Sequence, residues 1–167
     1  MMSTQPFSVL AHELAEQLRT KNLKITLAES CTGGLLAAQL TDLSHASQWF
    51  DRGFITYSNE AKAELIGVSP TLIENHGAVS EEVAQAMARG ALANSRAQVS
   101  IAITGIAGPG GGTAHKPVGM VCFAWGLTHG GLINIHSKTQ QFSGDRQMVR
   151  EQACVFALQE LLRLLKE

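Results

Sequence analysis

Short apolar runs with β propensity alternate with segments of helical periodicity along this chain, and this alternation limits the possible folds more than any other feature. Three such runs are separated by helical segments, and two further runs near the end are joined by a short link. Strands separated by helices form parallel pairs, whereas two strands joined by a tight turn form an antiparallel hairpin. The pattern therefore predicts an α/β fold, with a mixed sheet of about five strands and helices on both faces.

The boundaries of these elements follow from periodicity and from cap signals. Strands are expected at residues 24–28, 49–57, 97–104, 118–127 and 132–142. Helices are expected at residues 6–21, 33–43 and 59–66, from the turn that Ser69 begins, after Ser80, and at 145–166. In sheets of this kind, ligands bind beyond the carboxyl ends of the strands. We therefore expect a site where the loops after residues 28, 57 and 104 meet.

Length and charge restrict the organisation and the partners of the chain. With 167 residues and no linker-like segment, residues 1–167 are expected to form a single domain around one core. A net charge of -1 and a pI near 6.6 offer no basic field for a nucleic-acid backbone. No run approaches the roughly 18 to 20 apolar residues that cross a bilayer, and charges interrupt the N-terminal segment where a signal peptide needs an apolar run. We expect a cytoplasmic protein that binds neither nucleic acid nor membrane.

The three cysteines have no metal-ligand spacing. Cys31, Cys122 and Cys154 form no CxxC or CxxH pattern, and their number is odd. A disulfide framework or a zinc cage would require paired cysteines at short intervals. We therefore expect reduced thiols and no bound metal.

The motif AESCTGG, directly after the first expected strand, is the first candidate for chemistry. Ser30 becomes a nucleophile when a base takes its proton, and backbone N–H groups at the start of the following helix could hold the resulting oxyanion. The residues that would offer those donors are Thr32, Gly33 and Gly34. Two alternatives remain open: Ser30 or Thr32 could simply cap the helix, or Cys31 could be the nucleophile.

Lys62 is the best candidate for the base. None of the six histidines has an evident carboxylate partner in the sequence. Either Ser58 or Asn59 could cap this helix. If Asn59 does so, the dipole disfavours an ammonium at Lys62 by only about 0.3 to 1 kcal/mol, so desolvation must also lower its pKa. Tyr57, just before this helix, could orient a proton. The alternatives are a solvated lysine and a tyrosine that closes the core.

The segment GIAGPGGG, residues 105–112, is too rich in glycine for a regular element. Glycine lets backbone N–H groups approach phosphate oxygens, although the spacing matches neither GxGxxG after a first strand nor a P-loop. The alternative is a long mobile connection. Arg146 and Arg150 lie one helical turn apart near the end of the chain. Both could donate hydrogen bonds to one phosphate, or they could lie on a solvated helix face.

Several motifs in order, AESCTGG, GFITYSNEAK, GAVSEEVAQAMA, ITGIAGPGGG, KPVG and FSGDRQMVR, closely resemble the CinA C-terminal domain family. The similarity covers nearly the whole chain. It implies a three-layer α/β/α sandwich and a homo-oligomer, for which we favour a dimer. It also implies cofactor-free and metal-free hydrolysis of the carboxamide of nicotinamide mononucleotide, a step of pyridine nucleotide recycling that yields nicotinic acid mononucleotide and ammonia.

The resemblance also assigns roles to residues that match the family's motifs. It implies that Ser30 is the nucleophile, Lys62 its base and Tyr57 an auxiliary polar group. The substrate would be bound by a further set of residues: Thr32, Gly33, Gly34, Thr104, Gly105, Gly108, Gly110, Gly111 and Arg146. Of these, the glycine-rich loop and Arg146 suit the ribose-phosphate end. The chain departs from relatives at Ala114-His115 and Met120, where more polar residues are expected, which affects the loop contacts.

Three other functions have to be weighed. The same loops could hold a nucleotide in a non-catalytic regulatory module, in which no bond breaks. A cysteine amidase would depend on Cys31 and would tolerate the loss of Ser30. A role in DNA uptake, which the family's name suggests, lacks a basic patch in this sequence.

Overall fold

A mixed five-stranded sheet forms the centre of the molecule in the computed structural model, which describes residues 5–167. The first four residues of the expected domain lie outside the described part. The strands are β1 (Ile25–Glu29), β2 (Phe50–Ile55), β3 (Val99–Gly105), β4 (Met120–His129) and β5 (Leu132–Gln141). Their order is β2-β1-β3-β4-β5, with β1 parallel to β2 and β3, and with β4 antiparallel to both of its neighbours. The predicted mixed sheet is confirmed.

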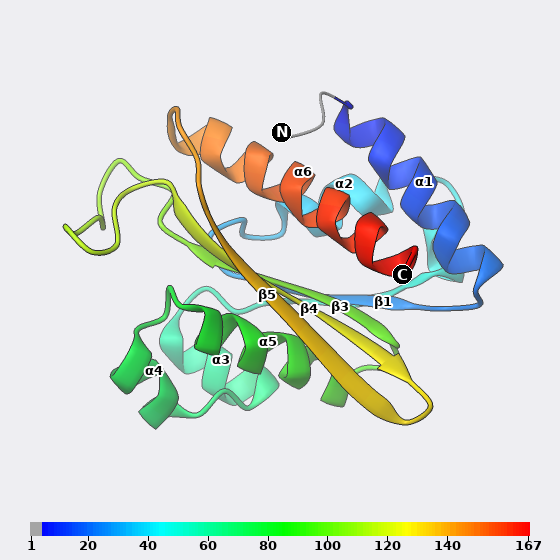
Figure 1. The fold of residues 1–167 in the computed structure, drawn as a ribbon, viewed down its shortest axis with the longest axis horizontal. Helices are drawn as coiled ribbons and strands as arrows, with labels where there is room; N and C mark the ends of the chain where they lie inside the picture. Colours follow the sequence, from blue (N-terminus) through cyan, green and yellow to red (C-terminus); the bar gives the residue numbers. More distant parts are fainter. Residues whose placement is uncertain (1–4) are drawn as a thin grey trace.

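Helices cover both faces of this sheet, so the molecule has three layers (Figure 1). One face carries α1 (Phe7–Thr20), α2 (Leu35–Thr41) and α6 (Arg146–Leu165), and the other carries α3 (Asn59–Ile66), α4 (Pro70–His76) and α5 (Glu81–Ala93). The α/β/α class is therefore confirmed. No helix within residues 5–167 combines the length and the apolar character that a membrane span requires.

Each face of the sheet has its own core. On the α1–α6 side, β1 and β3 contribute large side chains such as Ile25, Leu27 and Ile103. On the α5 side they contribute Ala28 and Ala102. Because these alanines are small, α5 can pack closely on the sheet.

A close contact between two helices also belongs to the α5 face. A Cβ built on Gly90 of α5 would lie only 2.0 Å from the backbone oxygen of Ile66, the last residue of α3. Glycine is therefore required at this position for the present spacing of the helices. The contact sets the distance of α3 from the sheet, and α3 carries Lys62.

The structure corrects several expected boundaries. The helix expected at 33–43 begins at Leu35, because Gly33 (φ 56°) and Gly34 (φ 101°) adopt left-handed backbone angles that an α-helix excludes. The hairpin link shortens to Gly130 and Gly131, both with positive φ, as a two-residue turn requires. A short 3₁₀ helix, η1 (Ala46–Gln48), was not expected.

Candidate active site

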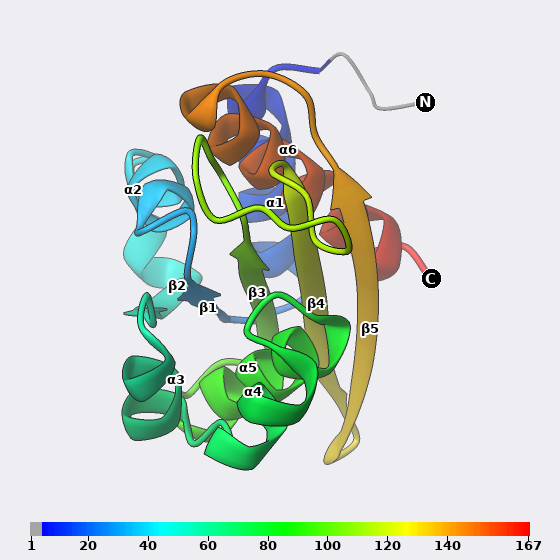
Figure 2. The same ribbon diagram turned by 90° about the vertical axis from the view of Figure 1, so that its left-hand side faces the viewer.

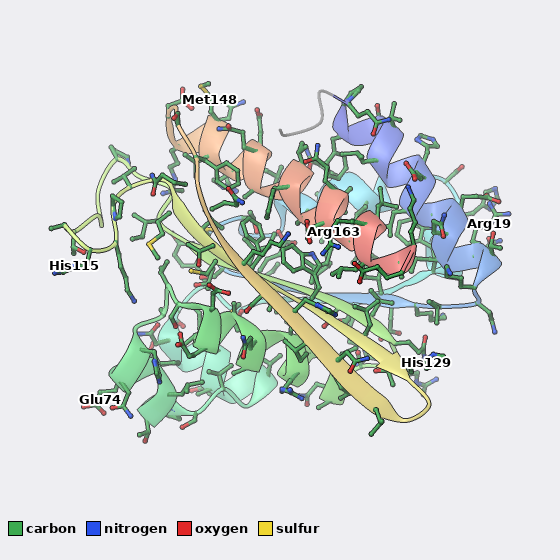
Figure 3. All side chains as sticks on the ribbon, viewed as in Figure 1. Arg19, Glu74, His115, His129, Met148 and Arg163 are labelled. Carbon is green, nitrogen blue, oxygen red and sulfur yellow. The ribbon has the colours of Figure 1, made fainter. Side chains whose placement is uncertain are left out.

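The three loops that follow β1, β2 and β3 meet at one end of the sheet, as the sequence predicts. Together they line a cleft of about 270 Å³, to which Ser30, Tyr57, Lys62 and Thr104 contribute. The glycine-rich loop after β3 covers this end of the strands, between α6 and the α4–α5 layer (Figure 2). The tip of the segment that continues it, at His115, projects away from the body of the molecule (Figure 3).

Ser30 lies immediately beyond the last residue of β1. Its N–H donates to the carbonyl of Ile103 in β3 at 2.9 Å, which continues the β1–β3 ladder by one residue. Its side chain is directed to the cleft and is 8% exposed. Strand pairing therefore holds the backbone that carries this hydroxyl.

Lys62 reaches the same point from α3. Its Nζ donates to Ser30 Oγ at 3.1 Å, to the carbonyl of Thr56 at 2.9 Å and to the carbonyl of Tyr57 at 3.3 Å. The side chain is only 1% exposed. Among the described residues, Lys62 takes part in no ion pair, so no carboxylate compensates for burial of its charge.

Burial determines the protonation of this amine. Desolvation lowers the pKa of Lys62 below its ordinary value, and only a weaker interaction with Cys31 opposes the shift. The helix contributes less than the sequence suggested, because Ser58 and not Asn59 is the N-cap, so that Lys62 lies one position further from the helix start. A lysine with a lowered pKa beside a serine hydroxyl is a suitable general base.

The start of α2 differs from the expected anion site. The buried carboxylate of Glu29 accepts hydrogen bonds from the N–H groups of Leu36 and Ala37 at 3.0 and 2.9 Å. It therefore occupies donors at the positive end of the helix dipole. The local sequence does not predict this role for Glu29, because an acidic residue six positions before a helix start gives little local signal.

The structure does not bring Thr32, Gly33 and Gly34 into the cleft. Thr32 is fully buried, and the N–H of Gly33 already donates to the carbonyl of Ser30 at 3.0 Å. The side of Gly34 on which a Cβ would stand faces Ile55 on β2. The reason is the left-handed turn at the two glycines, which directs this part of the loop away from Ser30.

Cys31 is adjacent to Ser30 but has the wrong environment for a nucleophile. It is 6% exposed, and burial raises the pKa of its thiol to about 12. Reactive cysteines have lowered pKa values, because the thiolate is the attacking species. Cys31 also lines the cleft, but its burial and the raised pKa of its thiol disfavour the cysteine alternative.

Tyr57 and Thr104 both line the cleft. Tyr57 is 60% exposed, so it does not close the core, and its hydroxyl accepts from Nη2 of Arg146 at 3.4 Å. Thr104 is buried, and its hydroxyl donates to the carbonyl of Ala78 at 2.9 Å. This bond ties the end of β3 to the segment that precedes α5.

The glycine-rich loop and Arg146 form the outer part of the cleft. Nη1 of Arg146 donates to the carbonyl of Gly108 at 2.8 Å. The other predicted glycines, Gly105, Gly110 and Gly111, also line the cleft. A Cβ at Gly105 would meet Val121 at 2.7 Å, whereas a Cβ at Gly110 would meet nothing within 4 Å. Open backbone at Gly110 leaves room for a ligand beside the arginine.

Arg150 does not join Arg146 at the cleft. Its Nε donates to the carbonyl of Cys31 at 3.1 Å, and its Nη2 donates to the carbonyl of Thr32 at 2.9 Å. The predicted pair of arginines is therefore divided between the cleft and the loop that follows β1. Within residues 5–167, no three His, Cys, Asp or Glu side chains are grouped so that they could share a metal ion.

These features define a three-layer α/β protein with a buried lysine bonded to a serine at the carboxyl ends of its parallel strands. Residues 8–165 match the family model described as the CinA C-terminal domain. The chain belongs to this family.

Relatives with curated names extend over nearly the same length. A protein of Enterobacter agglomerans, named nicotinamide-nucleotide amidohydrolase PncC, is 50% identical over 162 residues, which cover 97% of each chain. The PncC protein of Escherichia coli K12 is 47% identical and covers 96% of this chain and 95% of its own. A crystal structure of a competence or damage-inducible protein from Enterobacter asburiae has a TM-score of 0.91 at 40% identity and covers 97% of this chain and 99% of its own.

Proposed function

We propose that this chain hydrolyses the carboxamide of nicotinamide mononucleotide to nicotinic acid mononucleotide and ammonia, with Ser30 as nucleophile and Lys62 as base. The observation that carries the proposal is the 3.1 Å contact between Nζ of Lys62 and Oγ of Ser30 inside a cleft at the strand ends. The names of the PncC relatives, which match over nearly the full length, support the substrate. The reaction would serve the recycling of pyridine nucleotides.

The hydrogen-bond partners of Lys62 suit a neutral amine. A neutral amine has two N–H donors and one lone pair, and the three partners are two carbonyls and one hydroxyl. The Ser30 hydroxyl rests against the carbonyl of Tyr57 at 3.4 Å; when it turns to Nζ, with both amine protons directed to the carbonyls of Thr56 and Tyr57, the lone pair can accept its proton. An ammonium here would be buried without a counter-ion, which is unfavourable.

The steps follow from this arrangement. Oγ of Ser30 attacks the amide carbon while Lys62 takes the hydroxyl proton, and a tetrahedral oxyanion forms. Lys62 returns that proton to the leaving nitrogen, so that the C–N bond breaks and ammonia departs from an acyl-enzyme. Water, deprotonated by the same amine, then attacks the ester and releases the carboxylic acid and Ser30.

Backbone N–H groups would stabilise the oxyanion. With two α2 donors occupied by Glu29, the donor nearest to Ser30 in sequence is the N–H of Cys31, whose hydrogen-bond partner among the described residues is its own thiol. A backbone donor directly after the nucleophile occurs in other serine hydrolases. Removal of one oxyanion donor typically costs about 10²- to 10³-fold in kcat.

The charge of the cleft favours a substrate with a phosphate. Arg146 is the cation that lines it beside the neutral amine of Lys62, and no carboxylate does so within the described part of the chain. Arg146 lies at the outer end, beside the open backbone of Gly110. In our proposal the carboxamide lies at Ser30, and the phosphate lies against Arg146 and the loop glycines Gly105, Gly108, Gly110 and Gly111.

An ammonia-release assay tests the proposal. Purified protein is offered nicotinamide mononucleotide, nicotinamide riboside and nicotinamide, and Ser30→Ala and Lys62→Ala are measured beside the wild type. We expect turnover of the mononucleotide that both substitutions abolish. Binding of the mononucleotide without ammonia release would instead identify the non-catalytic module. The assembly into a homo-dimer stays a prediction, and sedimentation of the same preparation tests it.

A further inference from the structure

We propose that Arg150 is a positioning residue for the nucleophile: by holding the carbonyls of Cys31 and Thr32, it fixes the loop that presents Ser30. This inference rests on the proposed function, since it concerns the reactivity of the same serine. It differs from the expectation that Arg146 and Arg150 form one phosphate site.

The geometry of Arg150 suits a clamp on the backbone. Arg150 lies in the second turn of α6, and two nitrogens of its guanidinium group donate to two successive carbonyls, at 3.1 and 2.9 Å. A planar guanidinium offers such paired donors in a fixed orientation, which a lysine ammonium does not. The side chain is half-buried, and a Cβ on Gly33 would lie 3.6 Å from Nη2, so the group also packs against the loop.

The loop has few other attachments at these carbonyls. Within residues 5–167, no other side chain donates a hydrogen bond to a carbonyl of residues 30–34. The remaining backbone bonds are internal or lie at its ends: Ser30 N–H to Ile103, Gly33 N–H to Ser30, Leu35 N–H to Thr32, and Ala38 N–H to Gly34. Without Arg150, the loop would be fixed by β3 before the turn and by α2 after it, with its middle held by internal bonds alone.

Fixing these carbonyls also fixes the N–H groups of the same peptides. In a trans peptide the N–H points opposite to the C=O, so the bond to the Cys31 carbonyl sets the direction of the Thr32 N–H. The bond to the Thr32 carbonyl likewise sets the Gly33 N–H, which donates to Ser30. Arg150 therefore orients the two peptides that follow Cys31, directly after the nucleophile, without lining the cleft.

We therefore expect different kinetic effects from the loss of Arg146 and the loss of Arg150. Arg146 contacts Tyr57 and Gly108 at the cleft and would bind substrate in the ground state, so its loss should raise KM. Arg150 would act on the geometry of attack, so its loss should lower kcat with little change in KM.

The experiment compares Arg150→Gln and Arg150→Lys with Arg146→Gln, and uses Arg163→Gln as a matched control. Arg163 lies on the same helix but donates to the carboxylates of Glu160 and Glu167, far from the loop. The readouts are kcat and KM for nicotinamide mononucleotide, the melting temperature, and the rate at which a fluorophosphonate probe labels Ser30.

For Arg150→Gln we expect kcat and the labelling rate to fall by about 10- to 100-fold, with KM within about twofold of the wild type. Arg150→Lys should recover part of the loss, because an ammonium can still bond one carbonyl, and Arg163→Gln should behave as wild type. If Arg150→Gln does not fold, Arg150→Lys provides the same comparison.

A raised KM with unchanged kcat would overturn the inference and make Arg150 a substrate ligand. Unchanged kcat and labelling would also overturn it. If Ser30→Ala is inactive but Arg150→Gln keeps the wild-type kcat, the inference alone fails. If Ser30→Ala remains fully active, the proposed function fails and the inference fails with it.

Discussion

The contact between α5 and α3 gives a prediction whose magnitude follows from the structure. In Gly90→Ala, the new Cβ would lie 2.0 Å from the backbone oxygen of Ile66 and 3.0 Å from its carbonyl carbon. Neither atom belongs to a flexible side-chain end, so α3 must move away by about 1 Å before ordinary contact is restored. Overpacking of this kind costs about 1–3 kcal/mol. The better helix propensity of alanine offsets at most about 1 kcal/mol.

Subtracting this offset leaves a net loss of up to about 2 kcal/mol, which corresponds to a fall in melting temperature of up to about 8 °C for a chain of this size. Because Lys62 lies on the displaced helix, its amine also moves relative to Ser30. A misplacement of about 1 Å can cost about 100-fold in rate. We expect kcat to fall more than the loss of stability alone explains, since the protein remains folded at the assay temperature.

Thermal unfolding and ammonia release test this prediction together. Arg89→Ala is the matched control, because it lies on the exposed side of the same helix and gains helix propensity without a clash. The control should melt at or slightly above the wild-type temperature with unchanged kcat. If Gly90→Ala melts like the wild type and keeps its kcat, α3 is not positioned by this contact and the reasoning is wrong.

Three further predictions concern the cleft. Cys31→Ala should keep kcat within about twofold in the ammonia assay, because a buried thiol with a pKa raised to about 12 takes no part in attack; its inactivation would favour the cysteine alternative. Arg146→Gln should raise KM for the mononucleotide by about 10-fold or more, through loss of a charged hydrogen bond, and should leave any riboside turnover unchanged. The third is a pH effect: the pKa of Lys62 is lowered in the folded protein, while the unfolded chain holds that proton up to about 10.5. Between these values the unfolded state binds more protons, so this group makes stability rise with pH. The kcat/KM should rise at the lower end of this range, where the amine of the folded enzyme deprotonates, and then level off. Lys62→Met should lose that part of the rise in a denaturant titration repeated across pH, and an identical slope in both proteins would contradict the assignment.

Local patterns were sufficient to predict the fold because each strand and helix has its own signal. Alternating apolar runs, the caps at Ser58 and Ser80, and the glycine pair at 130–131 act over a few residues. The same patterns placed Ser30 directly after one strand and Lys62 in the helix after the next strand, and parallel pairing brings these segments together.

The parts of the site that the sequence analysis missed depend on contacts between distant segments. Arg150 reaches the loop after β1 only because of the way α6 docks on the sheet, and helical spacing alone cannot distinguish that contact from a phosphate site. The role of Glu29 depends on the turn at Gly33 and Gly34, which brings the first turn of α2 back to its carboxylate. The depth at which Lys62 is buried is likewise a tertiary property.

Mass spectrometry of the acylated enzyme shows whether Ser30 is the nucleophile and whether Lys62 is its base. The wild type is mixed with nicotinamide mononucleotide, quenched in acid within the first turnovers, and digested to the peptide that contains both Ser30 and Cys31. The account predicts an ester of the nicotinic acid mononucleotide acyl group on the Ser30 hydroxyl in the wild type and no adduct in Lys62→Ala. An adduct on the Cys31 thiol, or a Lys62→Ala enzyme that acylates at the wild-type rate, would contradict it.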